Sequence, residues 1–70
     1  MATTTEKIGI KLRWLREKKG LSQQDVADRI GMTKQTIYKY EQGIVSISVK
    51  QLEEILNIYD VSLGKFLDDI

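Results

Sequence analysis

Three glycines, at positions 20, 31 and 43, limit what this 70-residue chain can fold into, because each follows a short segment with the apolar period of a helix. The chain has no proline, so glycines and capping side chains mark the helix boundaries. They predict helices at about residues 6–18, 23–30, 34–42, 49–59 and 63–69. No segment of useful length alternates like a strand. The sequence therefore predicts an all-α fold of five helices, with residues 1–70 forming one domain.

Side chains that favour the N-cap position precede four of these helices: Ser22, Thr33, Ser48 and Ser62. Gln51 follows Ser48 by three residues and completes a capping-box pattern, whereas Asp25 after Ser22 is a weaker variant. The inner faces are expected at Ile8, Leu12, Leu15, Val26, Ala27, Ile30, Ile37, Tyr40, Leu52, Ile55, Leu56, Tyr59, Leu63, Phe66 and Leu67.

The composition excludes several classes of site. Without cysteine the chain has neither disulfides nor thiolate metal ligands, and without histidine it lacks the usual general base. We therefore expect no enzyme, no metal site and no cofactor. The amino terminus lacks the apolar core of a signal peptide, and no apolar run reaches membrane-spanning length. These features predict a soluble, cytoplasmic protein without a membrane partner.

Charge is distributed unevenly along the chain. Residues 1–43 contain nine lysines and arginines against five acidic residues (net +4), whereas residues 44–70 contain two against five (net −3). A basic first half fits a small domain that turns one face toward a polyanion. A chain this short can also reach such an imbalance by chance.

Residues 22–43, SQQDVADRIGMTKQTIYKYEQG, predict two short helices joined by a tight turn that contains Gly31. The second helix of such a unit projects from its domain and can enter a major groove. Its outer positions from 34 to 39 hold long hydrogen-bond donors and an aromatic ring but no carboxylate, unlike an ordinary solvated face. A groove-binding helix explains this composition better than a merely soluble surface.

Three stretches, LRWLREKKGLSQQDVADRIG, TKQTIYKYEQG and SISVKQLEEILNIYDVSLGKFL, together resemble the Cro/C1-type (Xre-family) helix-turn-helix domain of lambdoid phage repressors and small bacterial regulators. The resemblance covers about four-fifths of the chain and implies the five-helix lambda-repressor-like DNA-binding fold. It further implies that Lys34, Gln35 and Lys39 read bases, with Tyr38 beside them. Lysine can donate to guanine, and glutamine can form a bidentate pair with adenine.

The resemblance also implies roles outside base reading. Gln23, Thr33, Thr36 and Gln42 match or flank positions that contact DNA phosphates in the family. For Gln23 and Thr33, helix capping alone is the alternative. Arg16 and Glu41 match an internal ion pair that ties the first helix to the recognition helix.

The loop GIVSIS departs from the family, in which this loop is often rich in lysine, arginine and proline. Ile47 is expected to tuck under the fourth predicted helix. Ile44 and Val45 predict a homodimer patch, with stray surface apolar residues as the alternative. Ile10 and Trp14 form a second apolar stripe on the first predicted helix. Packing against the last predicted helix is the favoured interpretation of this stripe, and a partner surface is the other.

Together these patterns predict a sequence-specific regulator of transcription that binds double-stranded DNA. The favoured form is a repressor that binds an inverted-repeat operator as a homodimer. The alternative is a protein-interaction module, such as an antitoxin or adaptor, on the same scaffold.

Overall fold

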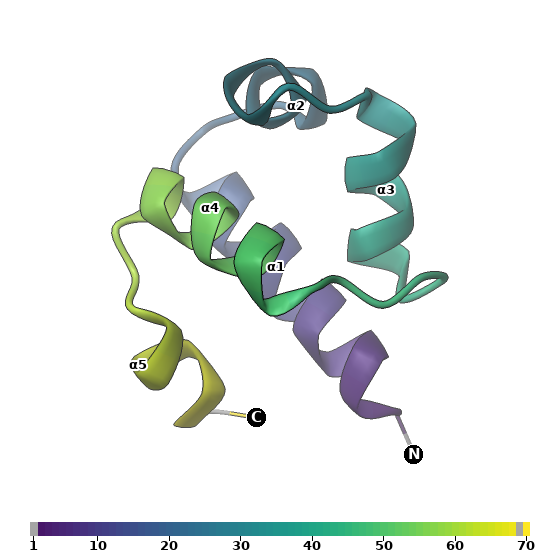
Figure 1. Ribbon diagram of the computed structural model, residues 1–70, viewed down its shortest axis with the longest axis vertical. Helices are drawn as coiled ribbons and strands as arrows, with labels where there is room; N and C mark the ends of the chain where they lie inside the picture. Colours follow the sequence, from purple (N-terminus) through teal and green to yellow (C-terminus); the bar gives the residue numbers. More distant parts are fainter. Residues whose placement is uncertain (1, 69) are drawn as a thin grey trace.

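Five helices surround one apolar core in the computed structural model, which describes residues 2–68 and 70. They are α1 (Thr4–Lys18), α2 (Gln23–Ile30), α3 (Lys34–Gln42), α4 (Val49–Tyr59) and α5 (Leu63–Asp68). In Figure 1, α4 crosses in front of α1, α2 lies above them, and α3 and α5 lie on opposite sides. The described residues form no strand, so the predicted all-α fold is confirmed.

Each of these helices begins directly after a serine or threonine whose hydroxyl accepts a hydrogen bond from a first-turn backbone N–H: Thr3, Ser22, Thr33, Ser48 and Ser62. The cap at Thr3 moves the start of α1 to Thr4, two residues before the predicted position. At the other end of the chain, α5 is described as far as Asp68, and its predicted end at residue 69 lies outside the described residues.

The capping boxes differ from those expected from the sequence. Asp25 forms a complete box with Ser22, because its carboxylate accepts from the backbone N–H of Ser22 at 2.9 Å while its own N–H donates to the Ser22 hydroxyl. These bonds hold the pKa of Asp25 below its ordinary value. Of the capping box predicted at Ser48 and Gln51, only the half made by the Ser48 hydroxyl is present, and the half predicted for the Gln51 side chain is wrong. The Gln51 amide oxygen instead accepts a 2.6 Å hydrogen bond from the Tyr40 hydroxyl, which ties α3 to α4.

The buried core contains one or more side chains from every helix: Leu12, Val26, Ala27, Ile37, Tyr40, Leu52, Ile55, Leu56, Tyr59 and Phe66. Burial raises the pKa of Tyr59 to about 12, because ionisation would place a charge in the apolar core. Ile47 packs against the core as expected. Leu67, expected to face inward, is instead exposed.

The apolar stripe of α1 also differs from its favoured interpretation. Ile10 is 63% exposed and Trp14 is 53% exposed, so neither side chain is buried against α5. Both belong to the outer surface of the domain, because the opposite side of α1 carries the buried Leu12. No helix of the described part of the chain is long and apolar enough to cross a membrane.

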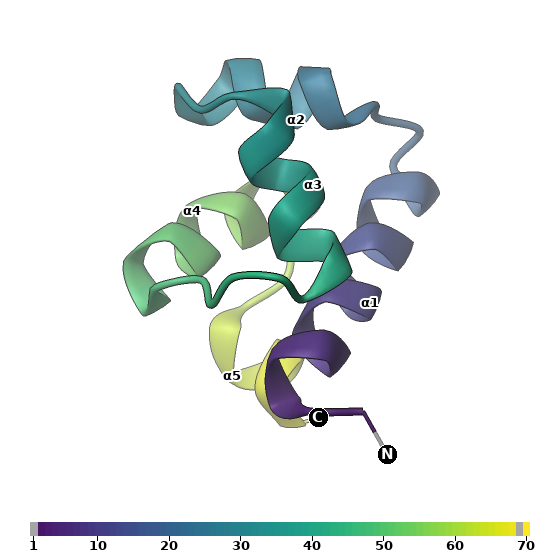
Figure 2. The same cartoon turned by 90° about the vertical axis from the view of Figure 1, so that its right-hand side faces the viewer.

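Gly9 sets the distance between α1 and α3. A Cβ atom added there would lie 2.5 Å from the carbonyl oxygen of Tyr40 and 2.6 Å from that of Glu41. Any side chain at this position would therefore push the carboxyl end of α3 away from α1. Figure 2 shows the result, with α3 in front of the helices that support it and its outer side unobstructed.

We expect Gly9→Ala to lower the free energy of unfolding by about 1–3 kcal/mol, because two backbone carbonyls must move to admit one methyl group. Urea titration followed by circular dichroism measures the change. Gly64→Ala is the matched control, since its added Cβ meets nothing within 4 Å and alanine favours the helix by up to about 1 kcal/mol. Equal effects at the two positions would contradict this role for Gly9.

Candidate nucleic-acid interface

The turn between α2 and α3 is closed by backbone geometry. Gly31 adopts φ +70° and ψ 32°, a left-handed conformation that glycine adopts without strain. The N–H groups of Gly31 and Met32 both donate to the carbonyl of Ala27, which ends α2, and Thr33 then caps α3. Two short helices joined by such a turn form a helix-turn-helix unit.

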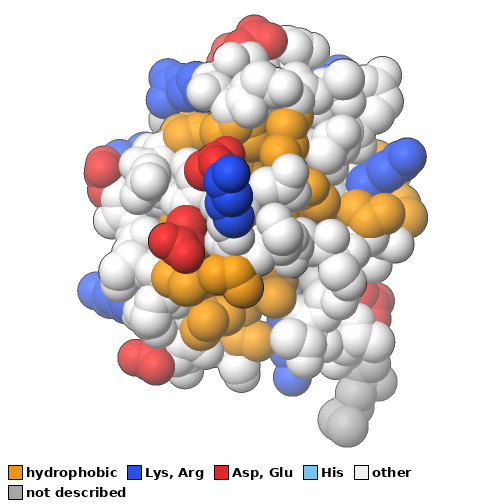
Figure 3. Space-filling model, viewed as in Figure 1, with side chains coloured by type: hydrophobic (Ala, Val, Ile, Leu, Met, Phe, Trp, Pro, Cys, Tyr) orange, Lys and Arg blue, Asp and Glu red, His pale blue; other side chains and the backbone are white. Residues whose placement is uncertain are grey.

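The two faces of α3 have opposite characters. Ile37, Tyr40 and Glu41 are buried against the domain, so the only carboxylate on this helix is withdrawn from the surface. The outer face carries four exposed side chains that the sequence assigns to base reading: Lys34, Gln35, Tyr38 and Lys39. At the edge formed by α3 in Figure 3, a basic side chain lies beside a hydrophobic one.

A shallow depression joins α3 to the beginning of α2. It is lined by Gln23, Lys34, Gln35 and Tyr38. The helix-turn-helix thus brings Gln23 of α2, a predicted phosphate contact, next to three predicted base-reading residues of α3. Side chains that can donate hydrogen bonds therefore line this depression from both α2 and α3.

Thr33 and Thr36 lie together at the start of α3. Their hydroxyl oxygens are 3.0 Å apart, and the Thr33 hydroxyl also accepts from the backbone N–H of Thr36 at 3.3 Å. In their mutual hydrogen bond only one hydroxyl is the donor, so the other retains an O–H for an acceptor outside the protein. Capping and a phosphate contact are therefore compatible at this position.

A buried network holds α3 against α1. Glu41, 5% exposed, accepts from Arg16 Nε at 2.7 Å and from Arg16 Nη2 at 3.1 Å, while Arg16 Nη1 donates to the carbonyl of Leu21 at 2.8 Å. The Glu41 hydrogen bond raises the pKa of the Arg16 guanidinium. A bidentate pair of this kind has fixed geometry as well as charge attraction. The residues predicted to pair from the sequence thus lie in direct contact.

Gln23 belongs to the same network. Its Nε2 donates to Glu41 Oε1 at 3.1 Å. Because a carboxylate only accepts, the amide nitrogen must face Glu41, and a second N–H of the same group remains. Glu41 therefore fixes the orientation of the Gln23 amide, an effect that the sequence pattern did not reveal.

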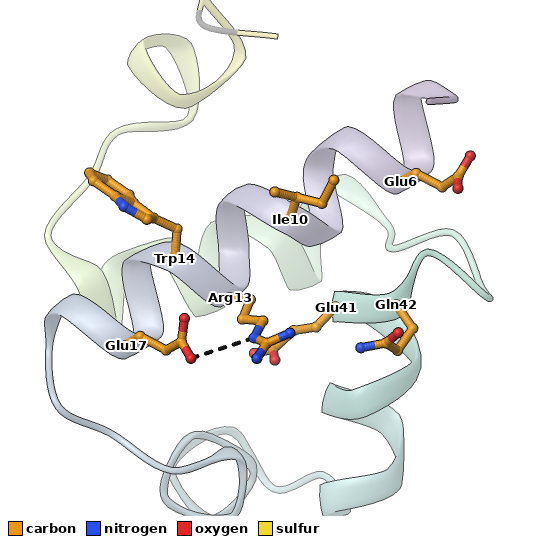
Figure 4. Close-up of a pocket in the computed structure, with 7 residues that line it drawn as sticks. All are labelled: Glu6, Ile10, Arg13, Trp14, Glu17, Glu41 and Gln42. Carbon is orange, nitrogen blue, oxygen red and sulfur yellow. Dashed lines mark ion pairs between the residues drawn. The ribbon is translucent and has the colours of Figure 1, made fainter. Parts of the chain in front are cut away.

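Gln42, the last residue of α3, lines a different hollow from the depression described above. It is exposed at the carboxyl end of α3 and lines a groove against α1 with Glu6, Ile10, Arg13, Trp14, Glu17 and Glu41 (Figure 4). Arg13 and Glu17, both on α1, form an exposed ion pair beside this groove, with 3.5 Å between Arg13 Nε and Glu17 Oε2. A phosphate contact by Gln42 would therefore be made at the opposite end of α3 from the depression that Gln23 lines.

The loop between α3 and α4 presents apolar side chains. Ile44 is 62% exposed, and Val45 is also exposed. Val49, at the first position of α4, is 61% exposed and was missed in the sequence, where it reads as one more residue of an apolar helix. Exposed apolar side chains are therefore found both in the loop and at the start of α4.

The five helices and their central turn define a helix-turn-helix protein of the all-α, lambda-repressor-like class. Residues 12–66 match the helix-turn-helix family. This chain belongs to the Cro/C1-type helix-turn-helix family. Membership places it among binding domains rather than enzymes.

Several proteins with curated descriptions are similar to the chain. It is 34% identical to the HTH-type transcriptional regulator PuuR of Escherichia coli over 61 residues, which are 87% of this chain and 33% of that protein. It is 34% identical over 59 residues to the cryptic phage CTXphi transcriptional repressor RstR of Vibrio cholerae, covering 84% of this chain and 53% of the repressor. An uncharacterized HTH-type transcriptional regulator of Rickettsia conorii is 40% identical over 63 residues, which are 90% of this chain and 50% of that protein. The chain thus spans one third to about one half of the length of these relatives.

Glu41→Ala should lower the free energy of unfolding by about 3 kcal/mol, because Arg16 loses its carboxylate partner in a largely buried position. Glu41→Gln, which keeps the volume and one acceptor, should cost less. Arg13→Ala is the matched control: it breaks an ion pair whose side chains are both 56% exposed and should cost at most about 1 kcal/mol. Denaturant titration of the three variants tests this order, and an equal cost for Glu41→Ala and Arg13→Ala would contradict it.

Proposed function

We propose that this chain is a sequence-specific, double-stranded-DNA-binding regulator of transcription. The observation that carries the proposal is the outer face of α3, where exposed donors and a tyrosine stand without any exposed carboxylate. A carboxylate there would repel phosphates, and the only one on the helix is buried and paired with Arg16. The relatives described as transcriptional regulators support the same function.

Base reading is assigned to the side chains along that face. Lys34 and Lys39 can donate to guanine O6 and N7, and Gln35 can pair with both adenine N6 and N7. Tyr38, which is exposed between them, can contact a thymine methyl or a phosphate. An α-helix of this size fits the width of the major groove.

Phosphate contacts position the domain on the duplex. Gln23 supplies its second amide N–H, already oriented by Glu41, at the N-terminus of α2, where backbone N–H groups also favour an anion. Thr33 and Thr36 supply a hydroxyl at the start of α3, and Gln42 supplies an amide at its end. These contacts lie along both ends of α3 and fix its register in the groove.

We further propose a repressor that binds as a homodimer to an inverted repeat. Ile44, Val45 and Val49 form an exposed apolar patch beside the carboxyl end of α3, and burying it in a two-fold contact would place two recognition helices on one side of the dimer. The patch is small, so the dimer should be completed on DNA. A bound dimer would block transcription by covering the promoter. The relative RstR is described as a transcriptional repressor, which supports repression as the mode of action.

We expect Lys39→Ala to weaken binding to the preferred duplex by about 1–3 kcal/mol and to relax selection at one base position. The reason is that the lost donor acts on a base edge, not on a phosphate. Gln23→Ala should weaken all duplexes about equally, since phosphates carry no sequence information. Fluorescence anisotropy with a panel of singly substituted duplexes measures both patterns. Unchanged affinity and preference in Lys39→Ala would show that the reading face lies elsewhere.

Selection of bound duplexes from a random pool at near-physiological salt should enrich an inverted repeat with half-sites about one helical turn apart. Ile44→Asp should reduce affinity for that repeat at least tenfold, while affinity for an isolated half-site stays the same, because only the contact between subunits is lost. Lys50→Asp is the control, with the same introduced residue on α4 outside the apolar patch. An enriched single site would contradict the two-fold dimer but not DNA reading.

A further inference from the structure

We propose that Tyr40 and Gln51 are positioning residues for base reading, although neither side chain belongs to the outer face of α3. Through the hydrogen bond between them, α4 fixes the rotation of α3 about its own axis. That rotation decides which base edges the outer side chains of α3 can reach. The inference rests on the proposed function, because it concerns how α3 achieves selective DNA binding.

The bond joins the inner side of α3 to the first turn of α4. The Tyr40 hydroxyl donates to Gln51 Oε1 at 2.6 Å, and Tyr40 is only 8% exposed. The backbone N–H of Gln51 donates in turn to the Ser48 hydroxyl at 3.2 Å, within the cap that begins α4. The acceptor of the Tyr40 hydroxyl is therefore attached to a capped and ordered helix end.

This bond is the principal link between the two helices. The backbone of α3 packs closely against α1 and α2 but has few close approaches to α4. Among the residues that the structure describes, no other side-chain hydrogen bond joins α3 to α4. Loss of the Tyr40 hydroxyl would thus leave that side of α3 with apolar contacts alone, which have no preferred direction.

Hydrogen bonds hold α3 from two sides. Glu41 is bonded to Arg16 of α1 and to Gln23 of α2. Tyr40, the preceding residue, is bonded to α4. Consecutive residues of an α-helix point about 100° apart, so the two sets of bonds leave α3 in different directions. In Figure 2, α4 lies on one side of α3 and α1 on the other. A helix held from one side alone can roll about its axis, and the bond on the second side prevents that roll.

A roll of α3 would displace the side chains assigned to base reading. Gln35, Tyr38 and Lys39 are exposed on the side opposite the buried Ile37 and Tyr40. An α-helix with its side chains is about 10–12 Å across, so a roll of about 20° moves its surface by about 2 Å. A hydrogen bond to a base edge forms over a range of only about 0.5 Å. Even a small roll would therefore weaken the choice of one base over another.

Tyr40→Phe provides the first test, because it removes the hydroxyl and keeps the aromatic ring in the core. We expect the ratio of affinities for the preferred and the singly substituted duplexes to fall by about three- to tenfold, the effect of losing one hydrogen bond between neutral groups. Fluorescence anisotropy measures this ratio. Partial unfolding lowers the affinity for every duplex by the same factor, so a loss of stability alone leaves the ratio unchanged.

Tyr59→Phe is the matched control. It removes the same atom from a buried tyrosine of α4 whose hydroxyl has no hydrogen-bond partner among the described residues, and it should leave the ratio unchanged. Gln51→Met lacks the acceptor and should reduce the ratio as Tyr40→Phe does. Gln51→Glu keeps an acceptor for the Tyr40 hydroxyl, so it should retain the ratio while its charge lowers the affinity for all duplexes alike.

The outcomes separate this inference from the proposed function. If the unaltered chain selects a preferred duplex and Tyr40→Phe keeps the same ratio, the positioning role is overturned and sequence-specific DNA binding stands. Equal losses in Tyr40→Phe and Tyr59→Phe would also overturn the positioning role, since a general effect on the core would explain both. If the unaltered chain selects no preferred duplex, the proposed function fails and the positioning role fails with it.

Discussion

The buried carboxylate of Glu41 is the interaction on which the arrangement of the helix-turn-helix depends. It accepts two hydrogen bonds from Arg16 on α1 and one from Gln23 on α2, while Arg16 also donates to the carbonyl of Leu21 between them. A charge in such a position is tolerated only when its partners are fixed. The network therefore couples α1, the start of α2 and the end of α3, and Gly9 permits the close approach that this geometry requires.

This coupling has a direct effect on the surface of α3. The helix contains one carboxylate, and the same hydrogen bonds that stabilise the fold remove it from the face that meets solvent. What remains outside is positively charged or neutral and rich in donors. The proposed recognition face and the internal ion pair are thus two consequences of a single helix orientation.

The domain separates its surfaces by chemistry. The α3 face presents hydrogen-bond donors suited to a groove, the α3–α4 loop presents aliphatic side chains, and the outer side of α1 presents Ile10 and Trp14. In a chain of only 70 residues, a single helix has to contribute both to the core and to an outer surface. Helix α1 does this through its opposite sides, with Leu12 in the core and Trp14 outside.

The sequence by itself determined the helices, most of their caps, the turn at Gly31 and the exposed residues of α3, because these depend on contacts within about four residues. Only the tertiary structure decided how Gln51, Gln23 and Gly9 are used, since their partners Tyr40 and Glu41 come from other helices. It likewise decided that Trp14 remains exposed, which no local pattern distinguishes from packing against α5. Apolar period identifies a face of a helix, but which neighbour covers that face is set by the packing of the whole chain.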